Sequence, residues 1–265
     1  MLEVNDLKVA YRSRTIIEKL TLSPIAPGQL VSLLGPNGTG KSTLLKAMAG
    51  LLPPRHGTVR LNGTDLASLD FRERARHVVY LPQSLPASVH LRVMESVLVA
   101  ARASSLSQEA EHVTLEAVMA LLKRLGVDHL AMRYLDQLSG GQKQRLTIAR
   151  ALVKKPELLI MDDSASALDF ATDAALRQAI RKMAGSLTIF IVSQRASSIR
   201  SADRILLLDD GRLVGSGNHE ELLAKNQIYQ EIYYSQFPEE KPKRPPSDET
   251  ASISSAQGKE APDED

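Results

Sequence analysis

The stretch from Gly35 to Thr43 constrains this chain more than any other part of the sequence. It reads G-P-N-G-T-G-K-S-T and fits the phosphate-binding pattern G-x-x-x-x-G-K-[ST], the Walker A loop. Gln29–Leu34 predicts a short buried strand before the loop, and Lys41–Ala49 predicts a helix after it, with Gly50 as the stop. A chance glycine-rich turn rarely has both flanks, so the stretch predicts binding of a nucleoside triphosphate.

The residue types in this loop match the chemistry of a triphosphate. Glycines allow successive backbone N–H groups to face phosphate oxygens, and the following helix adds the positive end of its dipole. We expect Lys41 to reach the β and γ phosphates and the Ser42 hydroxyl to bind Mg²⁺. The predicted nucleotide-binding residues of the loop are Gly35, Asn37, Gly38, Thr39, Gly40, Lys41, Ser42 and Thr43.

Composition narrows the class of protein. The chain has 265 residues, 43% of them apolar, which is enough for one large domain or two small lobes with a sizeable core. The sequence has no run of about 18 apolar residues, so no membrane span is predicted, and no signal peptide is recognised. It has no cysteine for disulfides or thiolate metal sites. The formal net charge of +2 gives no reason to expect a nucleic-acid partner.

The first part of the chain predicts an antiparallel sheet. Leu2–Ala10 and Thr15–Leu22 have strand patterns, and Tyr11 ends the first of them. From spacing alone, Tyr11 is either an adenine-stacking aromatic or an ordinary strand-end tyrosine. Asn62-Gly63 and, much later, Asp210-Gly211 predict two-residue hairpins.

From about residue 84 to 137 the pattern turns helical and interrupts an alternation of strands and helices. Val93–Ala103 predicts one helix, and Ser107–Leu125 predicts a second with Ser107 as its N-cap. We interpret this block as an inserted helical subdomain. The apolar face of its second helix is expected in the core and comprises Val113, Ala117, Leu121 and Leu125.

After this block the alternation resumes. Residues 236–265 then become rich in Pro, Ser and acidic residues, so we expect a disordered charged tail. The predicted strands are Leu158–Met161, Leu187–Val192 and Arg204–Asp209, and the predicted helices are Ser139–Leu152 and Ala171–Ala184.

Three further stretches follow the loop in a specific order. L-S-G-G-Q at 138–142 opens a helix, the apolar strand at 158–161 delivers Asp162 and Asp163, and S-A-L-D at 166–169 follows at once. Each stretch alone is a weak signal, but their order and spacing after a Walker A loop are highly specific. Over about residues 1–235, the chain resembles the ATP-binding subunits of ABC transporters.

The resemblance implies a fold and a domain organisation. The fold is an α/β P-loop NTPase (RecA-like) core sheet flanked by helices, with an N-terminal antiparallel β-subdomain and an inserted helical subdomain at about 84–137. Residues 1–235 are then the ABC ATP-binding domain. The resemblance also implies a cytoplasmic location, peripheral to the inner face of the cell membrane.

The same resemblance implies roles for the site residues. Asp162 is the Walker B carboxylate, which holds Mg²⁺ near Ser42, and Gln83 is the glutamine that touches Mg²⁺ and water. Asp163 orients or deprotonates the attacking water, although a helix-capping acid is the alternative at a strand–helix junction. Tyr11 matches the adenine-stacking aromatic. A second group is the signature, Ser139, Gly140, Gly141 and Gln142, which closes over the γ phosphate held by the partner subunit. Asp169 is a further nucleotide-binding residue.

The predicted catalytic residues are Lys41, Gln83, Asp163 and Gln194. Two of these four, Asp163 and Gln194, depart from the family's pattern. Asp163 stands where the family normally has Glu, and a base about 1 Å too far from the water costs on the order of a hundredfold in rate. Gln194 stands where the family has the switch histidine and cannot carry a proton to the γ phosphate. We therefore expect normal ATP binding and slow turnover.

The two halves resemble different branches of the family. Up to about Gln144 the chain is similar to ATPase subunits of iron-siderophore, haem and cobalamin importers; from Arg145 to Phe237 it is similar to ATPase domains of heterodimeric multidrug exporters. The chain is therefore interpreted as a chimera or as a natural divergent subunit. Because the groove that receives the permease lies in the importer-like half, and the chain starts at the first ATPase strand, we favour import coupling.

Two other functions stay open. The chain could be the low-turnover regulatory partner of a heterodimeric exporter-like ATPase, which Asp163 and Gln194 favour. It could also be a soluble non-transport ABC ATPase, although such proteins usually carry tandem domains and this chain has one Walker A loop.

Overall fold

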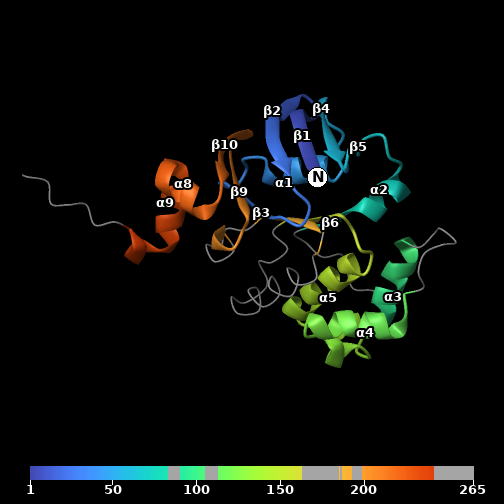
Figure 1. Ribbon diagram of the computed structural model, residues 1–265. Helices are drawn as coiled ribbons and strands as arrows, with labels where there is room; N and C mark the ends of the chain where they lie inside the picture. Colours follow the sequence, from blue (N-terminus) through green and yellow to red (C-terminus); the bar gives the residue numbers. More distant parts are fainter. Residues whose placement is uncertain (83–89, 105–112, 163–184, 186, 193–198, 242–265) are drawn as a thin grey trace, which may run out of the picture.

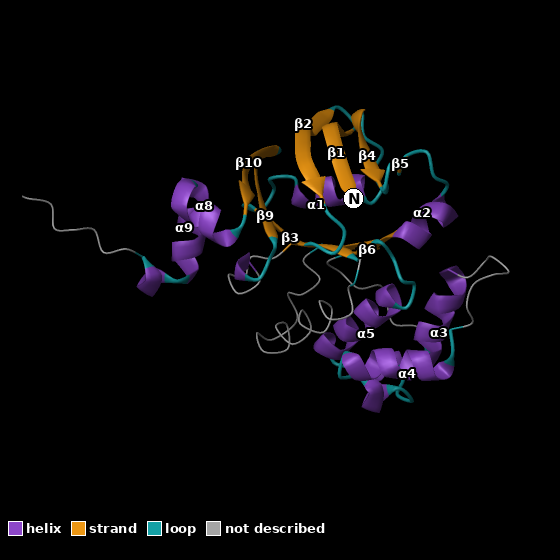
Figure 2. Ribbon diagram, in the orientation of Figure 1, coloured by secondary structure: helices purple, strands orange, loops and turns teal. Residues whose placement is uncertain are grey.

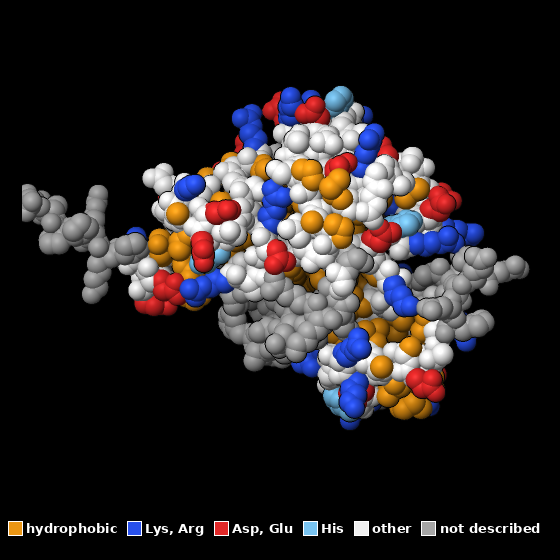
Figure 3. Space-filling model, viewed as in Figure 1, with side chains coloured by type: hydrophobic (Ala, Val, Ile, Leu, Met, Phe, Trp, Pro, Cys, Tyr) orange, Lys and Arg blue, Asp and Glu red, His pale blue; other side chains and the backbone are white. Residues whose placement is uncertain are grey.

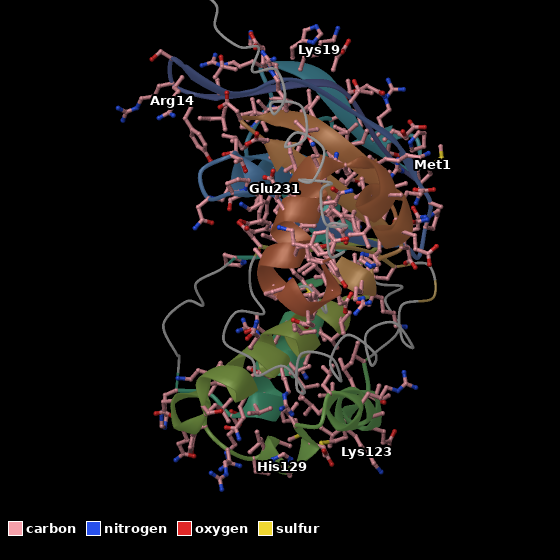
Figure 4. All side chains as sticks on the ribbon, turned by 90° about the vertical axis from the view of Figure 1, so that its left-hand side faces the viewer. Met1, Arg14, Lys19, Lys123, His129 and Glu231 are labelled. Atoms are coloured by element: carbon pink, nitrogen blue, oxygen red, sulfur yellow. The ribbon has the colours of Figure 1, made fainter. Side chains whose placement is uncertain are left out.

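The computed structural model describes residues 1–82, 90–104, 113–162, 185, 187–192 and 199–241 (Figure 1). An antiparallel sheet lies at one end of the molecule, a group of three helices lies at the other, and a mainly parallel sheet lies between them. In Figure 4 the labels Arg14 and Lys19 mark the antiparallel end, and Lys123 and His129 mark the helical end. The α/β fold class predicted from the sequence is confirmed.

The antiparallel sheet has the strand order β2-β1-β4-β5. Asn62 (φ 50°) and Gly63 (φ 83°) form the turn between β4 and β5, which confirms the predicted hairpin. Tyr11 ends β1 as predicted, opposite Arg14 in the ladder. The strands are β1 (Leu2–Tyr11), β2 (Arg14–Ile25), β4 (His56–Leu61) and β5 (Thr64–Asp65).

The second sheet has the order β10-β9-β3-β8-β7-β6, and every pair in it is parallel except β10 with β9. Parallel strands present their carboxyl ends at one edge, where ligands of open α/β sheets bind. The chain therefore leaves β3, β8, β7 and β6 at the same edge. The strands are β3 (Leu30–Leu34), β6 (Val78–Leu81), β7 (Leu158–Met161), β8 (Thr188–Val192), β9 (Arg204–Asp209) and β10 (Arg212–Gly217).

Helix α1 (Lys41–Met48) packs between the two sheets (Figure 2). Leu44, Leu45 and Met48 are fully buried in one hydrophobic cluster with side chains of β1, β2 and one face of the parallel sheet. Gly50, with φ 67°, follows the helix as the predicted stop. A short exposed helix, α2 (Phe71–His77), is capped by Asp70 and leads into β6.

The other face of the parallel sheet is covered by α3 (Val93–Ser104), α4 (Leu115–Arg124) and α5 (Gly140–Leu152). On the face of the molecule shown in Figure 3, hydrophobic side chains gather around these helices, whereas positive and negative side chains are interspersed over the sheets. Short 3-10 turns at Asp128–Leu130 and Leu135–Gln137 connect α4 to α5. The subdomain boundaries at 84 and 137 stay a prediction.

The prediction for the second helix of this group was wrong in two respects. Val113 and Thr114 precede the helix, and Thr114 rather than Ser107 caps it, accepting from Ala117 N at 3.2 Å; Ser107 itself lies outside the described residues. The predicted face was also wrong in part, because Val118 and Leu122, each one position further along than Ala117 and Leu121, are the fully buried side chains. Leu125 is buried as predicted, and Val113 and Leu121 are partly buried against the same hydrophobic cluster, whereas Ala117 is exposed. Val113, Ala117 and Leu121 line an open groove.

The chain ends its described part with α8 (His219–Lys225), α9 (Gln227–Gln236) and a 3-10 turn, Pro238–Glu240. Glu240 accepts from Arg200 at 3.1 Å and from the Tyr233 hydroxyl at 2.6 Å. The expectation of disorder from residue 236 is therefore wrong for 236–240, because an arginine and an aromatic cluster anchor this segment. The predicted helix 171–184 lies outside the described residues.

Candidate nucleotide-binding site

The loop from Gly35 to Gly40 joins β3 to α1 and has a backbone path that only glycine fits at its two ends. A Cβ on Gly35 (φ 148°) would lie 2.0 Å from the carbonyl oxygen of Leu208. A Cβ on Gly40 (φ 99°) would lie 3.0 Å from Ile16 Cγ2. Close contacts with β9 at Gly35 and with β2 at Gly40 thus leave no room for a side chain and restrict the shape of the loop.

Lys41, the first residue of α1, has only 8% of its surface exposed. Its Nζ donates to the carbonyl oxygens of Gly35 at 2.7 Å and Pro36 at 2.6 Å. The Thr39 hydroxyl also donates to Pro36 O, at 3.0 Å. A buried ammonium requires polar partners, and here the loop carbonyls hold it where the loop closes on the helix N-terminus. The loop therefore offers a fixed positive charge to an anion.

A cavity of about 390 Å³ opens above this loop. Its walls come from the β1–β2 hairpin, the loop, the start of α1 and the ends of β7 and β8. The residues that line it are Arg14, Ile16, Asn37, Gly38, Gly40, Lys41, Ser42, Thr43, Asp162 and Val192. The cavity has glycine backbone and a buried cation on one side and a carboxylate on the other, which suits a phosphate chain with a metal ion.

Asp162 directly follows β7 and is only 5% exposed. Its Oδ1 accepts from the Ser42 hydroxyl at 3.0 Å, and its Oδ2 accepts from the Tyr80 hydroxyl at 2.7 Å. Burial, and then the bond to Asp162, raise the pKa of Tyr80, so this hydroxyl stays a donor. Mg²⁺ is commonly held by one or two protein oxygens together with substrate phosphates, and the Ser42–Asp162 pair fits that requirement.

The helix start at Ser139 does not belong to this cavity. The Ser139 hydroxyl accepts from Gln142 N at 3.3 Å, and the Gln142 side chain accepts from Ser139 N at 2.9 Å, so the two residues form a capping box on α5. A Cβ on Gly140 would meet no atom within 4 Å. Neither Ser139, Gly140, Gly141 nor Gln142 lines the cavity of its own chain, and Ser139 and Gly140 are exposed.

The remaining predicted residues are placed only in part. Tyr11 is 44% exposed at the hairpin beside the cavity and is not among its lining residues. Gln83, Asp163, Asp169 and Gln194 lie outside the described residues. The strands β6, β7 and β8 end two residues before Gln83, Asp163 and Gln194 respectively, at the edge that carries the loop.

Four residues of the site were missed in the sequence. Arg14 and Ile16 enter through the β1–β2 hairpin, and Val192 enters at the end of β8. Tyr80 reaches Asp162 from β6. The hairpin next to Tyr11 was a usable signal for Arg14, whereas the contact of Tyr80 depends on strand order and had no local signal.

The sheet order and the glycine loop define a P-loop nucleoside triphosphate-binding protein, and comparison with known proteins refines this class. The sequence profile of the family described as ABC transporter matches residues 19–166. An ABC transporter ATP-binding protein of Methanocaldococcus jannaschii is 32% identical over 229 residues, covering 85% of this chain and 89% of that protein. The hemin import ATP-binding protein of Hahella chejuensis is 35% identical over 242 residues, covering 88% and 92%.

Among solved structures, a bacterial Atm1-family ABC exporter with ATP bound is similar to this chain with a TM-score of 0.77 and 28% identity, covering 89% of this chain and 42% of the exporter chain. The chain also spans only 37–40% of the length of several curated relatives, among them a mycobactin import ATP-binding/permease protein and lipid A-core flippases. The relatives thus include both importers and exporters.

The chain belongs to the ABC transporter family and is an ATP-binding subunit or domain of that family, with ATPase activity. ABC ATPase domains bind ATP, generally with Mg²⁺, and work as dimers with transmembrane permease partners. Within the described residues, no helix is both long and apolar enough to cross a membrane.

Proposed function

We propose that this chain hydrolyses ATP slowly within a dimer that sandwiches two nucleotides, and that the dimer drives a permease of the metal-chelate import type. The observation that supports this proposal is that the chain has a cavity suited to phosphates, whereas the L-S-G-G-Q start of α5 does not line that cavity. Each half of a site is then present in one chain, and a second copy or a related subunit supplies the other half.

The residues around the cavity have separable roles in this proposal. Lys41 and the loop N–H groups hold the phosphates, and Ser42 and Asp162 hold Mg²⁺, which when bound neutralises charge on the phosphates. Tyr11 stacks on adenine beside the cavity. Asp163 orients the attacking water, with Gln83 and Gln194 completing the ring of polar groups and Asp169 contacting the partner.

The dimer is tested by a charge placed at the start of α5. Ser139→Glu puts a carboxylate where the partner's γ phosphate would dock, so we expect loss of the ATP-dependent dimer in light scattering with ATP and EDTA. Thr114→Glu is the matched control, because Thr114 caps α4 with the same kind of bond and lies outside the site. If Ser139→Glu dimerises as well as Thr114→Glu, the sandwich is wrong.

Slow turnover is tested by restoring the family's usual residues. Asp163→Glu together with Gln194→His should raise the rate of ATP hydrolysis by one to two orders of magnitude, about the amount that a 1 Å misplacement of a base costs. The single variants show which position limits the rate. An unchanged rate in the double variant would locate the limit elsewhere.

A specific observation favours a second candidate, the low-turnover regulatory subunit of an exporter-like heterodimer. Asp163 and Gln194 stand in the half that resembles exporters, and an Atm1-family exporter is a close structural neighbour. The two candidate functions are separated by mixing the chain with a subunit that carries Glu and His at these positions. A regulatory subunit raises the rate of ATP hydrolysis by the mixture, and an autonomous ATPase does not. Stimulation of hydrolysis by permease proteins of a metal-chelate importer tests the import type.

A further inference from the structure

The Tyr80 hydroxyl donates a hydrogen bond to Asp162, whose carboxylate lines the cavity together with Lys41. We propose that Tyr80 is a positioning residue, which fixes the Asp162 carboxylate so that its other oxygen and Ser42 together form the divalent-cation site. This inference rests on the ATP-hydrolysing function proposed above. It assigns to Tyr80 an effect on cation affinity that is exerted only through Asp162.

The two oxygens of Asp162 have different partners, and this asymmetry carries the argument. Oδ2 accepts from Tyr80 at 2.7 Å, and Oδ1 accepts from Ser42 at 3.0 Å. The last torsion of an aspartate side chain is soft and roughly two-fold, so a carboxylate bonded at one oxygen only can turn. A charge-assisted bond at the second oxygen prevents this rotation, and Oδ1 stays directed at Ser42.

The backbone holds Tyr80 firmly enough for this role. In the parallel ladder, Tyr80 pairs with Ile160 and Leu81 pairs with Met161. Asp162 N also donates to Leu81 O at 2.9 Å, so the first residue after β7 is tied to the end of β6. The Tyr80 ring packs against the hydrophobic cluster below α1. Its hydroxyl is therefore positioned by two neighbouring strands and by packing.

The alternative is a tyrosine that merely satisfies its own hydroxyl in the interior. Tyr229 provides that case in the same chain: it is fully buried, and its hydroxyl lies 2.6 Å from His219 Nδ1 in the α8–α9 helices. Tyr80→Phe and Tyr229→Phe each remove one hydroxyl and one hydrogen bond to a side chain. Only the first change touches the carboxylate of the cavity.

The test measures cation affinity in the full chain by Mn²⁺ titration with electron paramagnetic resonance, at saturating AMP-PNP. Groups that orient metal ligands change metal affinity by about 10- to 100-fold when mutated, so Tyr80→Phe should raise the Kd for Mn²⁺ at least about tenfold. Tyr229→Phe should leave this Kd within about twofold of the wild-type value. Affinity for AMP-PNP in EDTA should be unchanged in both variants, since the phosphate loop is intact.

Three outcomes would count against these proposals, and they can be told apart. A wild-type Kd for Mn²⁺ in Tyr80→Phe overturns the positioning role, and so does equal weakening in both tyrosine variants, which indicates a general loss of stability. If the wild-type chain itself binds neither AMP-PNP nor Mn²⁺, the proposed function fails and the inference fails with it. Urea unfolding of each variant confirms that it is folded.

Discussion

The β9–β10 hairpin supports the phosphate loop from a distance of about 170 residues along the sequence, and Gly211 is the point of contact. Gly211 N donates to the carbonyl oxygen of Thr39 at 3.0 Å. A Cβ on Gly211 would lie 1.9 Å from the carbonyl oxygen of Ile16, and the residue has φ 72°. Gly211→Ala must therefore move either the hairpin or β2 by about 1 Å.

The magnitude follows from two terms. An alanine in the left-handed region costs about 1–2 kcal/mol, and loss of the bond to Thr39 costs about 0.5–1.5 kcal/mol. We expect the free energy of unfolding to fall by about 1.5–3.5 kcal/mol, with the clash adding to the upper end. At about 2–4 °C per kcal/mol for a chain of this size, the melting temperature should fall by about 3–14 °C.

The assay combines thermal unfolding with ATP affinity, and Gly63→Ala is its matched control. Gly63 has φ 83° in the other hairpin, and a Cβ there would meet nothing within 4 Å. It should therefore lower stability by the backbone term alone, about 1–2 kcal/mol. Gly211→Ala should in addition weaken ATP binding about 2- to 10-fold, because Thr39 loses its support. Equal destabilisation and unchanged ATP affinity in both variants would refute this reasoning.

Three further changes test other parts of the structure. Ser42→Ala removes the 3.0 Å bond to Asp162 and the proposed Mg²⁺ ligand, so hydrolysis should fall at least about tenfold, whereas ATP binding in EDTA should persist. Burial lowers the pKa of His219 below its ordinary value of 6.5; its contribution to stability is complete above pH 6.5 and is lost as pH falls through the folded-state pKa. Urea unfolding between pH 5 and 8 should show a smaller loss on the acid side in His219→Gln. Glu240→Gln weakens the pair with Arg200, so proteolysis of the C-terminal segment should accelerate with little change in ATP affinity.

Local sequence patterns predicted the buried elements that consist of a short apolar run with polar or turn-forming residues at both ends. β7 and β9 have the predicted bounds, because each is a short apolar run between polar or turn-forming residues. Both hairpins were confirmed, since Asn62-Gly63 and Asp210-Gly211 adopt the positive φ that such turns require. The phosphate loop lies between β3 and α1 as its flanks predicted.

Other features depend on tertiary contacts with residues far away in the sequence, which a local sequence pattern does not contain. The face of α4 is chosen by α3 and α5, which bury Val118 and Leu122 and leave Ala117 outside. The segment 236–240 looks like the start of a polar tail, and it is Arg200 that holds it. Tyr80 and Asp162 meet only because β6 lies beside β7, so their bond required the sheet order.

The lysine that curls back onto its own loop has a consequence for how nucleotide is captured. Lys41 donates hydrogen bonds to the carbonyl oxygens of Gly35 and Pro36, so the loop keeps its curvature through contacts within its own segment. Ordering a residue takes about 1–2 kcal/mol of backbone entropy, and here that loss belongs to folding of the domain. A triphosphate that binds here therefore meets a loop whose backbone is already ordered.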